Sequence, residues 1–407
     1  MAERSKGMTG AATRATRLAH AGRDVPTFGG KTVNPPLSRA STILFDDLAS
    51  LSDGKDRRRE PDFIQYGRFG TETHTALRKA WSELEGADDT LLLPCGLAAN
   101  VLTLLAFVES GDHVLMIDNV YAPARGSCDG LLAPLGVETT YFDPQIGAGI
   151  EELIRPNTRL IYLETPGSHS FELCDVPAYV EVARRHGIKT ALDNTWATPL
   201  FYRPLEQGVD VSIQAGTKYL GGHSDVMLGL VAASGETFRI LREKCDLLGY
   251  SVAADEAYLA LRGFRTLDVR LRRHEAGALE VARWLASLPE VERVLHPALP
   301  DHPQHALFAR DFDGASGLFG IVLKPGFAPA AVASMVDNLT YFGLGYSWGG
   351  YESLIVPSPV EKMRTATSWD AAGRTLRLHI GLEDPADLIA DLAAGFGRLR
   401  DAAQAAE

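Results

Sequence analysis

The chain has 407 residues, 45% of them hydrophobic, which is enough to build more than one buried core. Its 40 basic and 52 acidic side chains give a formal charge of −12, which argues against a general nucleic-acid or anionic-membrane binder and suits a soluble metabolic enzyme. No apolar run is long enough to span a membrane. The four cysteines are scattered without paired spacing, which argues for a reduced, cytoplasmic setting and against a metal site.

The N-terminal stretch is rich in arginine but lacks the apolar core of a secretory signal. Residues 1–67 are predicted to form an arm that packs on a neighbouring subunit, although composition alone also allows an organellar presequence. Short β-prone segments then alternate with helix-length segments such as 98–108 and 177–186. The strands are expected at residues 91–93, 113–117, 137–142, 160–163, 189–192, 211–213 and 226–232.

This alternation predicts an α/β fold with a mostly parallel, doubly wound sheet covered by helices on both faces, in a large domain of residues 68–265. A long helix is predicted at about 266–288. It leads into a smaller α+β domain of residues 266–407, with strands at 318–323 and 376–380 and helices at 330–338 and 386–399.

Ligands in such sheets bind beyond the carboxyl ends of the strands, and the Pro94, Glu164, Asp193 and Lys218 segments all fall there. Lys218 stands where a buried strand breaks into small residues. Partial burial lowers the pKa of a lysine and frees its amine to attack an aldehyde. The plain alternative is a strand-end lysine that points into water.

Two further strand ends carry residues that can bind a ligand. Asp193 ends an apolar strand, where a carboxylate can pair with a cationic group or simply cap the next turn. The segment from Cys95 through Gly96 to Leu97 turns from a strand into a helix, and exposed amides at a helix start attract phosphate. This second signal is weak alone, because many α/β turns contain glycine.

Taken together, these segments resemble the pyridoxal-phosphate enzymes of cysteine and methionine metabolism, and within that family the bacterial cystathionine β-lyases. The resemblance runs from about Ala19 to Glu383. Its most specific stretches, in order, are residues 66–71, 163–168, 193–196, 217–225, 347–352 and 377–383. It implies the aspartate-aminotransferase-like fold (fold type I) with pyridoxal 5'-phosphate as cofactor.

The resemblance also implies the residues of the cofactor site. Lys218 would hold the cofactor as a Schiff base, while Asp193 would keep the pyridine nitrogen protonated. The remaining ligands would be Tyr121 stacked on the ring and, at the phosphate, Thr217 with the amides of Gly96 and Leu97. Tyr66 and Arg68 would reach the phosphate of a neighbouring subunit, which implies a homo-oligomer of at least two chains and favours a tetramer; an ordinary surface arginine is the alternative.

Two positions depart from the family pattern. Parts of the family have a serine three residues before the lysine, where this chain has Ala215. A backbone group or Ser212 would have to replace that phosphate contact. Cys95 stands where serine is more common, and we interpret it as a small packing residue rather than a reactive thiol.

The substrate side is expected on the C-terminal part of the chain. Arg377 lies in a strand-like run and, by resemblance, binds the substrate α-carboxylate in a bidentate pair. Ser347 and Trp348 resemble the loop that closes over this carboxylate, and Tyr346 lines the same pocket. Plain core packing of Trp348 is the alternative.

The activity implied is α,β-elimination on L-cystathionine, which gives homocysteine, pyruvate and ammonia. Lys218 would remove the Cα proton, and Lys218 or Tyr121 would protonate the leaving sulfur. Gly167 and Ser168, where γ-acting relatives tend to carry asparagine, and Trp348, where they have a smaller residue, favour β-cleavage. The alternatives are a cysteine or cystine desulfhydrase, a cysteine-S-conjugate β-lyase, a cystathionine γ-lyase or sulfhydrylase and, in a different class, a non-catalytic regulatory protein that binds the cofactor.

Overall fold

The large sheet has seven strands and confirms the predicted α/β class. The computed structural model describes residues 13–23, 32–57, 60 and 62–405. The strands are β1 (Asp89–Leu93), β2 (His113–Ile117), β3 (Glu138–Phe142), β4 (Thr158–Glu164), β5 (Lys189–Asp193), β6 (Val211–Ala215) and β7 (Gly229–Ala233). Their order is β1-β7-β6-β5-β4-β2-β3, and only β7 runs antiparallel to its neighbours. Strands β2, β5 and β7 are almost wholly buried, as in a sheet covered on both faces.

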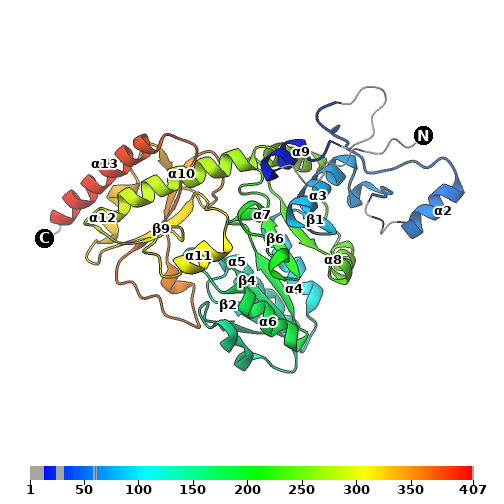
Figure 1. The fold of residues 1–407 in the computed structure, drawn as a ribbon, viewed down its shortest axis with the longest axis horizontal. Helices are drawn as coiled ribbons and strands as arrows, with labels where there is room; N and C mark the ends of the chain where they lie inside the picture. Colours follow the sequence, from blue (N-terminus) through cyan, green and yellow to red (C-terminus); the bar gives the residue numbers. More distant parts are fainter. Residues whose placement is uncertain (1–12, 24–31, 58–59, 61, 406–407) are drawn as a thin grey trace.

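Helices lie on both faces of the large sheet (Figure 1). They are α3 (Glu72–Glu85), α4 (Gly96–Phe107), α5 (Ala122–Ser127), α6 (Val176–His186), α7 (Thr198–Phe201), α8 (Gly235–Leu248) and α9 (Ala254–Phe264). Most connect consecutive strands, so the strands enter the sheet in the same direction and their carboxyl ends meet along one edge.

A second, smaller sheet follows the long helix α10 (Leu267–Ala286). Its strands are β8 (Val291–Leu295), β9 (Leu318–Leu323), β10 (Phe342–Gly343), β11 (Ser353–Pro357) and β12 (Thr375–His379), in the order β10-β11-β12-β9-β8. Three helices accompany it: α11 (His305–Asp311), α12 (Pro329–Val336) and α13 (Pro385–Gln404). Figure 1 shows α10 running from the large-sheet part to the small sheet, where α12 and α13 lie side by side.

The core forms two hydrophobic clusters that meet at α10. Leu271, in the first half of this helix, belongs to the larger cluster, whereas Val281 and Leu285 belong to the smaller one. The helix therefore joins the large-sheet part of the chain to the small-sheet part. The exact domain boundary near residue 266 stays a prediction.

The two helices of the N-terminal segment differ in how much of their apolar surface is buried. Helix α1 (Arg14–His20) packs on its own chain, because Leu18 is buried and Arg14 pairs with Asp313. Around α2 (Leu48–Arg57), in contrast, Leu44 and Leu48 are 89% and 82% exposed. Residues 1–12 and 24–31 of the predicted arm lie outside the described residues. Within the described ranges, no helix is long and apolar enough to cross a membrane.

Candidate active site

One cavity of about 220 Å³ lies at the edge where the carboxyl ends of the parallel strands meet. Glu164 ends β4, and Asp193 ends β5 directly opposite it in register. Lys218 follows β6 in a turn closed by the bond from its N–H to the Ala215 carbonyl (3.1 Å). From the small-sheet side, Trp348 and Arg377 complete the lining. The ligand edge predicted from the strand pattern is therefore the edge that carries the cavity.

The Lys218 amine faces into this cavity instead of into bulk water. Its Nζ donates to Ser347 Oγ at 2.8 Å and lies 5.2 Å from the centre of the Trp348 ring. Burial and the nearby charge of Arg377 lower the pKa of Lys218 to about 8, against an opposing effect of Asp193. With this pKa, about a tenth of the amine is unprotonated at pH 7, which makes it available as a nucleophile or a base.

Asp193, which is buried, and Glu164, which is partly buried, form a pair of carboxyls beside the lysine. Burial raises the pKa of Asp193, but Thr195 opposes this by donating its N–H (3.0 Å) and its hydroxyl (2.5 Å) to Oδ1, as does the charge of Lys218. Burial and the charge of Asp193 raise the pKa of Glu164 well above its ordinary value. Each negative charge disfavours the other, so Glu164 is the carboxyl that is more readily protonated, and Asp193, with the two bonds from Thr195, is the one more readily ionised.

The start of α4 provides an anion-binding turn at the cavity wall. Cys95 is the N-cap residue, and its Sγ accepts the Ala98 N–H at 3.4 Å. The N–H groups of Gly96 and Leu97, in the first turn, have no partner within the helix. A Cβ at Gly96 would lie 2.7 Å from the Cβ of Ala215, so only glycine allows this close approach of helix and strand. The geometry suits a phosphate group.

Of the two substitutes considered for the serine missing at Ala215, a backbone group or Ser212, the structure excludes Ser212. Its hydroxyl donates to Glu85 Oε1 at 2.7 Å inside the core, away from the cavity. Side chains along a strand alternate between faces, and Ser212 lies an odd number of residues before Ala215, so the two point to opposite sides. Thr217 does line the cavity, and its hydroxyl accepts the Leu228 N–H at 3.0 Å.

On the small-sheet side, Arg377 presents a buried guanidinium. It is 8% exposed, and it donates to the carbonyls of Tyr346 (2.8 Å) and Ser347 (3.3 Å). Burial lowers its pKa to about 10, so it stays charged at neutral pH. Among the described residues no carboxylate pairs with it. A buried cation without an anionic partner suits a carboxylate ligand.

The loop that contains Trp348 lies directly against Lys218. The Trp348 ring packs on Tyr219, with ring centres 5.4 Å apart, and it also lines the cavity, so its packing and its position at the site are compatible. Gly349 has φ +89°, and a Cβ there would lie 2.8 Å from the Lys218 carbonyl carbon. Tyr346 stands at the rim and is 91% exposed.

Tyr121 enters the cavity from the turn before α5. Its N–H donates to Glu164 Oε2 at 2.7 Å, which ties its backbone to the end of β4. Burial, followed by the charge of Asp193, raises the pKa of its phenol. The hydroxyl therefore stays protonated at neutral pH.

Tyr66 and Arg68 are not brought to this cavity within one chain. Arg68 donates to the Asp246 carbonyl at 3.3 Å and lies over the Phe69 ring, while Tyr66 is half exposed. Their predicted reach into a neighbouring subunit stays a prediction.

Three residues of the cavity received no role from the sequence. Glu164 was placed at a strand end, but its position beside Asp193 depends on the order of the strands, which no local pattern shows. Asn100 lies on α4 beside Asp193 and lowers the pKa of that carboxyl. His169, held at φ +66°, bonds through Nδ1 to Ser358 Oγ at 2.7 Å, and burial together with Arg377 lowers its pKa to about 4. No local pattern marks it.

Comparison with known proteins decides the family. The model of the Cys/Met metabolism PLP-dependent enzymes matches residues 15–397. The chain belongs to this family. Cystathionine beta-lyase MetC of Escherichia coli is 46% identical over 94% of this chain and 98% of its own length. The L-alanine/L-glutamate racemase of Wolbachia pipientis is 42% identical over 94% of this chain and 96% of its own.

A solved structure agrees with this assignment. Cystathionine gamma synthase from Xanthomonas oryzae pv. oryzae, in complex with aminoacrylate and cysteine, superposes with a TM-score of 0.87 at 32% identity, covering 96% of this chain and 99% of that one. Because these relatives are named for three different reactions, family membership does not by itself choose among them.

The cavity residues fit pyridoxal phosphate, the cofactor of this family. The glycine turn at Gly96 suits a phosphate, and the Asp193 carboxyl, whose ionised form the bonds from Thr195 favour, suits a protonated pyridine nitrogen. The Lys218 amine, with its lowered pKa, suits an aldehyde.

Proposed function

We propose that this protein is a cystathionine β-lyase, which cleaves L-cystathionine to homocysteine, pyruvate and ammonia. The observation that carries the proposal is the Lys218 amine, with its lowered pKa, in one cavity with Arg377 and Trp348. Cystathionine β-lyases of Escherichia coli and Salmonella typhimurium, each 46% identical to this chain, support it.

The cofactor would be held by residues from several strand ends. Lys218 would bind it covalently, Asp193 would pair with the ring nitrogen, and Tyr121 would lie against the ring. The amides of Gly96 and Leu97, with the hydroxyl of Thr217, would bind the phosphate. When bound, pyridoxal phosphate supplies an electron sink that acidifies the Cα–H bond of an amino acid.

Arg377 would bind the α-carboxylate of the substrate. Its guanidinium is held by the carbonyls of Tyr346 and Ser347, so it needs little reorganisation to receive a carboxylate. This bond would orient the substrate so that its Cα–H faces Lys218 across the cavity.

Lys218 and Tyr121 would then move the protons. The lysine amine, tethered at the end of β6, is unprotonated often enough to take the Cα proton. Tyr121, whose phenol has a raised pKa, would donate a proton to the leaving sulfur. At neutral pH the lysine amine is partly unprotonated, as a base requires, and the phenol is protonated, as an acid requires.

Two positions favour cleavage at Cβ. The Trp348 ring occupies the space beside the lysine, which leaves less room for the longer reach of a γ-cleaving path. A Cβ at Gly167 would lie 2.0 Å from Asn119 Nδ2, so no larger residue fits there in this arrangement. The neighbouring Ser168 leaves the site without the asparagine typical of γ-acting relatives.

We further propose a cytoplasmic homotetramer with sites shared between subunits, acting in methionine biosynthesis. Arg68 lies outside the cavity of its own chain, and the exposed Leu44 and Leu48 offer an apolar surface for a second chain.

The proposal is tested by incubating the purified protein, loaded with pyridoxal phosphate, with L-cystathionine and measuring thiol release. Lys218→Ala should abolish release while the circular dichroism spectrum and the melting temperature stay unchanged. Lys189→Ala is the matched control, since this lysine begins β5 at the other end of the sheet and pairs with Asp210. Turnover by Lys218→Ala would refute the assignment.

A further inference from the structure

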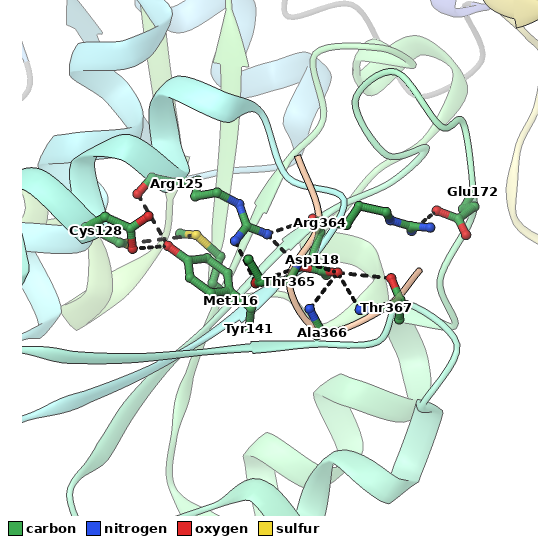
Figure 2. A network of polar contacts seen from close by, with 11 residues as sticks. Met116, Asp118, Arg125, Cys128, Tyr141, Glu172, Arg364, Thr365, Ala366 and Thr367 are labelled. Carbon is green, nitrogen blue, oxygen red and sulfur yellow. Dashed lines mark hydrogen bonds and ion pairs between the residues drawn. The ribbon is translucent and has the colours of Figure 1, made fainter. Parts of the chain in front are cut away.

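Asp118 collects an unusual number of hydrogen bonds at the carboxyl end of β2. It is fully buried, and Arg125 donates to its Oδ1 at 2.6 Å. From a distant part of the chain, Thr365 N–H (3.0 Å), Ala366 N–H (3.1 Å) and Thr367 N–H (2.9 Å) all donate to the same carboxylate. The Thr367 hydroxyl adds another bond at 3.0 Å. Figure 2 shows Asp118 between Arg125 and these three residues.

The donors belong to a connection of the small sheet, residues 358–367, which we call the strap. The strap makes two more contacts with the large-sheet part. Arg364, whose side chain is 4% exposed, pairs with Glu172, and Ser358 Oγ bonds His169 Nδ1 at 2.7 Å. The strap is therefore fixed at three points, at Asp118, His169 and Glu172.

These three points belong to the two loops that form one wall of the cavity. The first loop runs from Asp118 to Tyr121 and the second from Glu164 to Glu172. The loops are bonded to each other, because Ser168 N–H donates to the Asn119 carbonyl (2.8 Å) and Tyr121 N–H donates to Glu164. None of the described residues that line the cavity belongs to the strap. The strap thus holds the cavity wall from outside.

The other end of the strap is attached beside Arg377. Ser358 N–H donates to the Thr375 carbonyl at 2.9 Å, and Thr375 lies two residues before Arg377 on β12. A continuous path of bonds therefore leads from the strand that carries Arg377, through the strap, to the loop that carries Tyr121.

The charge of Asp118 makes this attachment strong. Burial would raise its pKa, but the bonds from Thr365, Arg125, Ala366 and Thr367 outweigh burial and hold the pKa below its ordinary value. The carboxylate stays ionised, and hydrogen bonds to an ionised acceptor are roughly twice as strong as neutral ones.

We propose that the strap is a positioning device, which fixes the loops of Tyr121 and His169 relative to Arg377 and so sets the width of the substrate cavity. Asp118 is its main anchor and a positioning residue, since it touches neither substrate nor cofactor. Only the kinetic part of the test below rests on the proposed function.

The direct test is amide hydrogen exchange in Asp118→Asn. The reporters are the Tyr121 N–H, bonded to Glu164, and the Ser168 N–H, bonded to Asn119. Loss of a charge-assisted anchor should make both exchange about tenfold faster. Asp112→Asn is the matched control, because Asp112 precedes the same strand and pairs with Arg159 at its other end. Unchanged exchange at both reporters in a folded Asp118→Asn would overturn the proposal.

A milder variant covers the case in which Asp118→Asn does not fold. Thr367→Val removes only the hydroxyl bond to Asp118, and Thr367→Ser keeps it. Thr367→Val should exchange faster at the same two amides, and Thr367→Ser should match the wild type. Equal behaviour of the two variants would refute the role of the bond.

Kinetics distinguish positioning from plain stabilisation. In Thr367→Val we expect the KM for L-cystathionine to rise several-fold, with a smaller change in kcat and an unchanged visible absorbance of the bound cofactor. Faster exchange with an unchanged KM would contradict positioning. If the wild type itself does not cleave cystathionine, the proposed function fails, and the exchange measurements still decide whether the strap holds the two loops.

Discussion

At the scale of single residues, the site depends on which carboxyl carries charge. The residue types at the strand ends predicted Lys218 and Asp193, because a strand end can be recognised locally, whereas Arg377, in the middle of β12, was predicted by the family resemblance. The sequence did not predict that Glu164 lies beside Asp193 in register, since strand order is not a local property. Sequence reasoning therefore missed the second carboxyl of the pair, whose pKa burial and the charge of Asp193 raise.

We predict that catalysis is more sensitive to replacement of Asp193 than to replacement of Glu164. Asp193→Asn removes the charge proposed for the ring nitrogen and should lower kcat/KM by roughly 10²-fold or more. Glu164→Gln replaces a neutral acid by a neutral amide that can still accept the Tyr121 N–H, so kcat/KM should fall by less than about tenfold. Steady-state kinetics with L-cystathionine measure both. An equal loss in the two variants would show that Glu164 also carries a charge.

At the scale of elements, most of the large sheet was predictable and much of the small one was not. Strand β9 was predicted with its observed bounds and α10 within a few residues, because long apolar periodicity is a strong signal. Strand β10 has two residues and β8 includes half-exposed positions, so neither gives a clear pattern. The antiparallel direction of β7 was also missed, since direction depends on the connection and not on the strand.

Helix α3 and strand β6 share a buried acid with a pH-dependent effect on stability. Burial raises the pKa of Glu85 to about 8, against the bond from Ser212. In the unfolded chain this carboxyl titrates near pH 4.3. Between these two values the unfolded chain releases the proton and the folded chain keeps it, so this group lowers the free energy of unfolding as the pH rises.

We therefore predict that Glu85→Gln removes part of the pH dependence of stability. Denaturant unfolding of the wild type and the variant should be compared at pH 5 and pH 8. The wild type should lose stability relative to Glu85→Gln by up to about 1.4 kcal/mol per pH unit over this range. If the difference in free energy of unfolding between the wild type and Glu85→Gln did not change with pH, the raised pKa of Glu85 would be contradicted.

At the scale of the whole molecule, function depends on how two sheets are joined. Lys218 and Asp193 come from the large sheet and Arg377 from the small one, so the cavity exists only where the parts meet. The family resemblance predicted this arrangement in outline. The contacts of the strap could not be predicted, because Asp118 and residues 364–367 are far apart in sequence and share no pattern.

Sharing of sites between subunits is tested by mixing two defective chains. Arg68→Ala and Lys218→Ala should each be nearly inactive alone. When the two variants are co-expressed, about half of the dimers contain one chain of each variant. In such a dimer one of the two sites has both an intact Lys218 and an intact Arg68. About a quarter of the wild-type activity should therefore return. No recovery in mixed oligomers would show that Arg68 does not serve a neighbouring site.

The central claim is cleavage at Cβ of cystathionine, and the keto acid product tests it most directly. The protein loaded with pyridoxal phosphate is incubated with L-cystathionine, and the keto acid is identified by chromatography. We predict pyruvate together with homocysteine, formed at a rate that is lost in Lys218→Ala. Formation of 2-oxobutyrate with cysteine would contradict the account, because it would place the cleaved bond at Cγ despite Trp348 and Gly167.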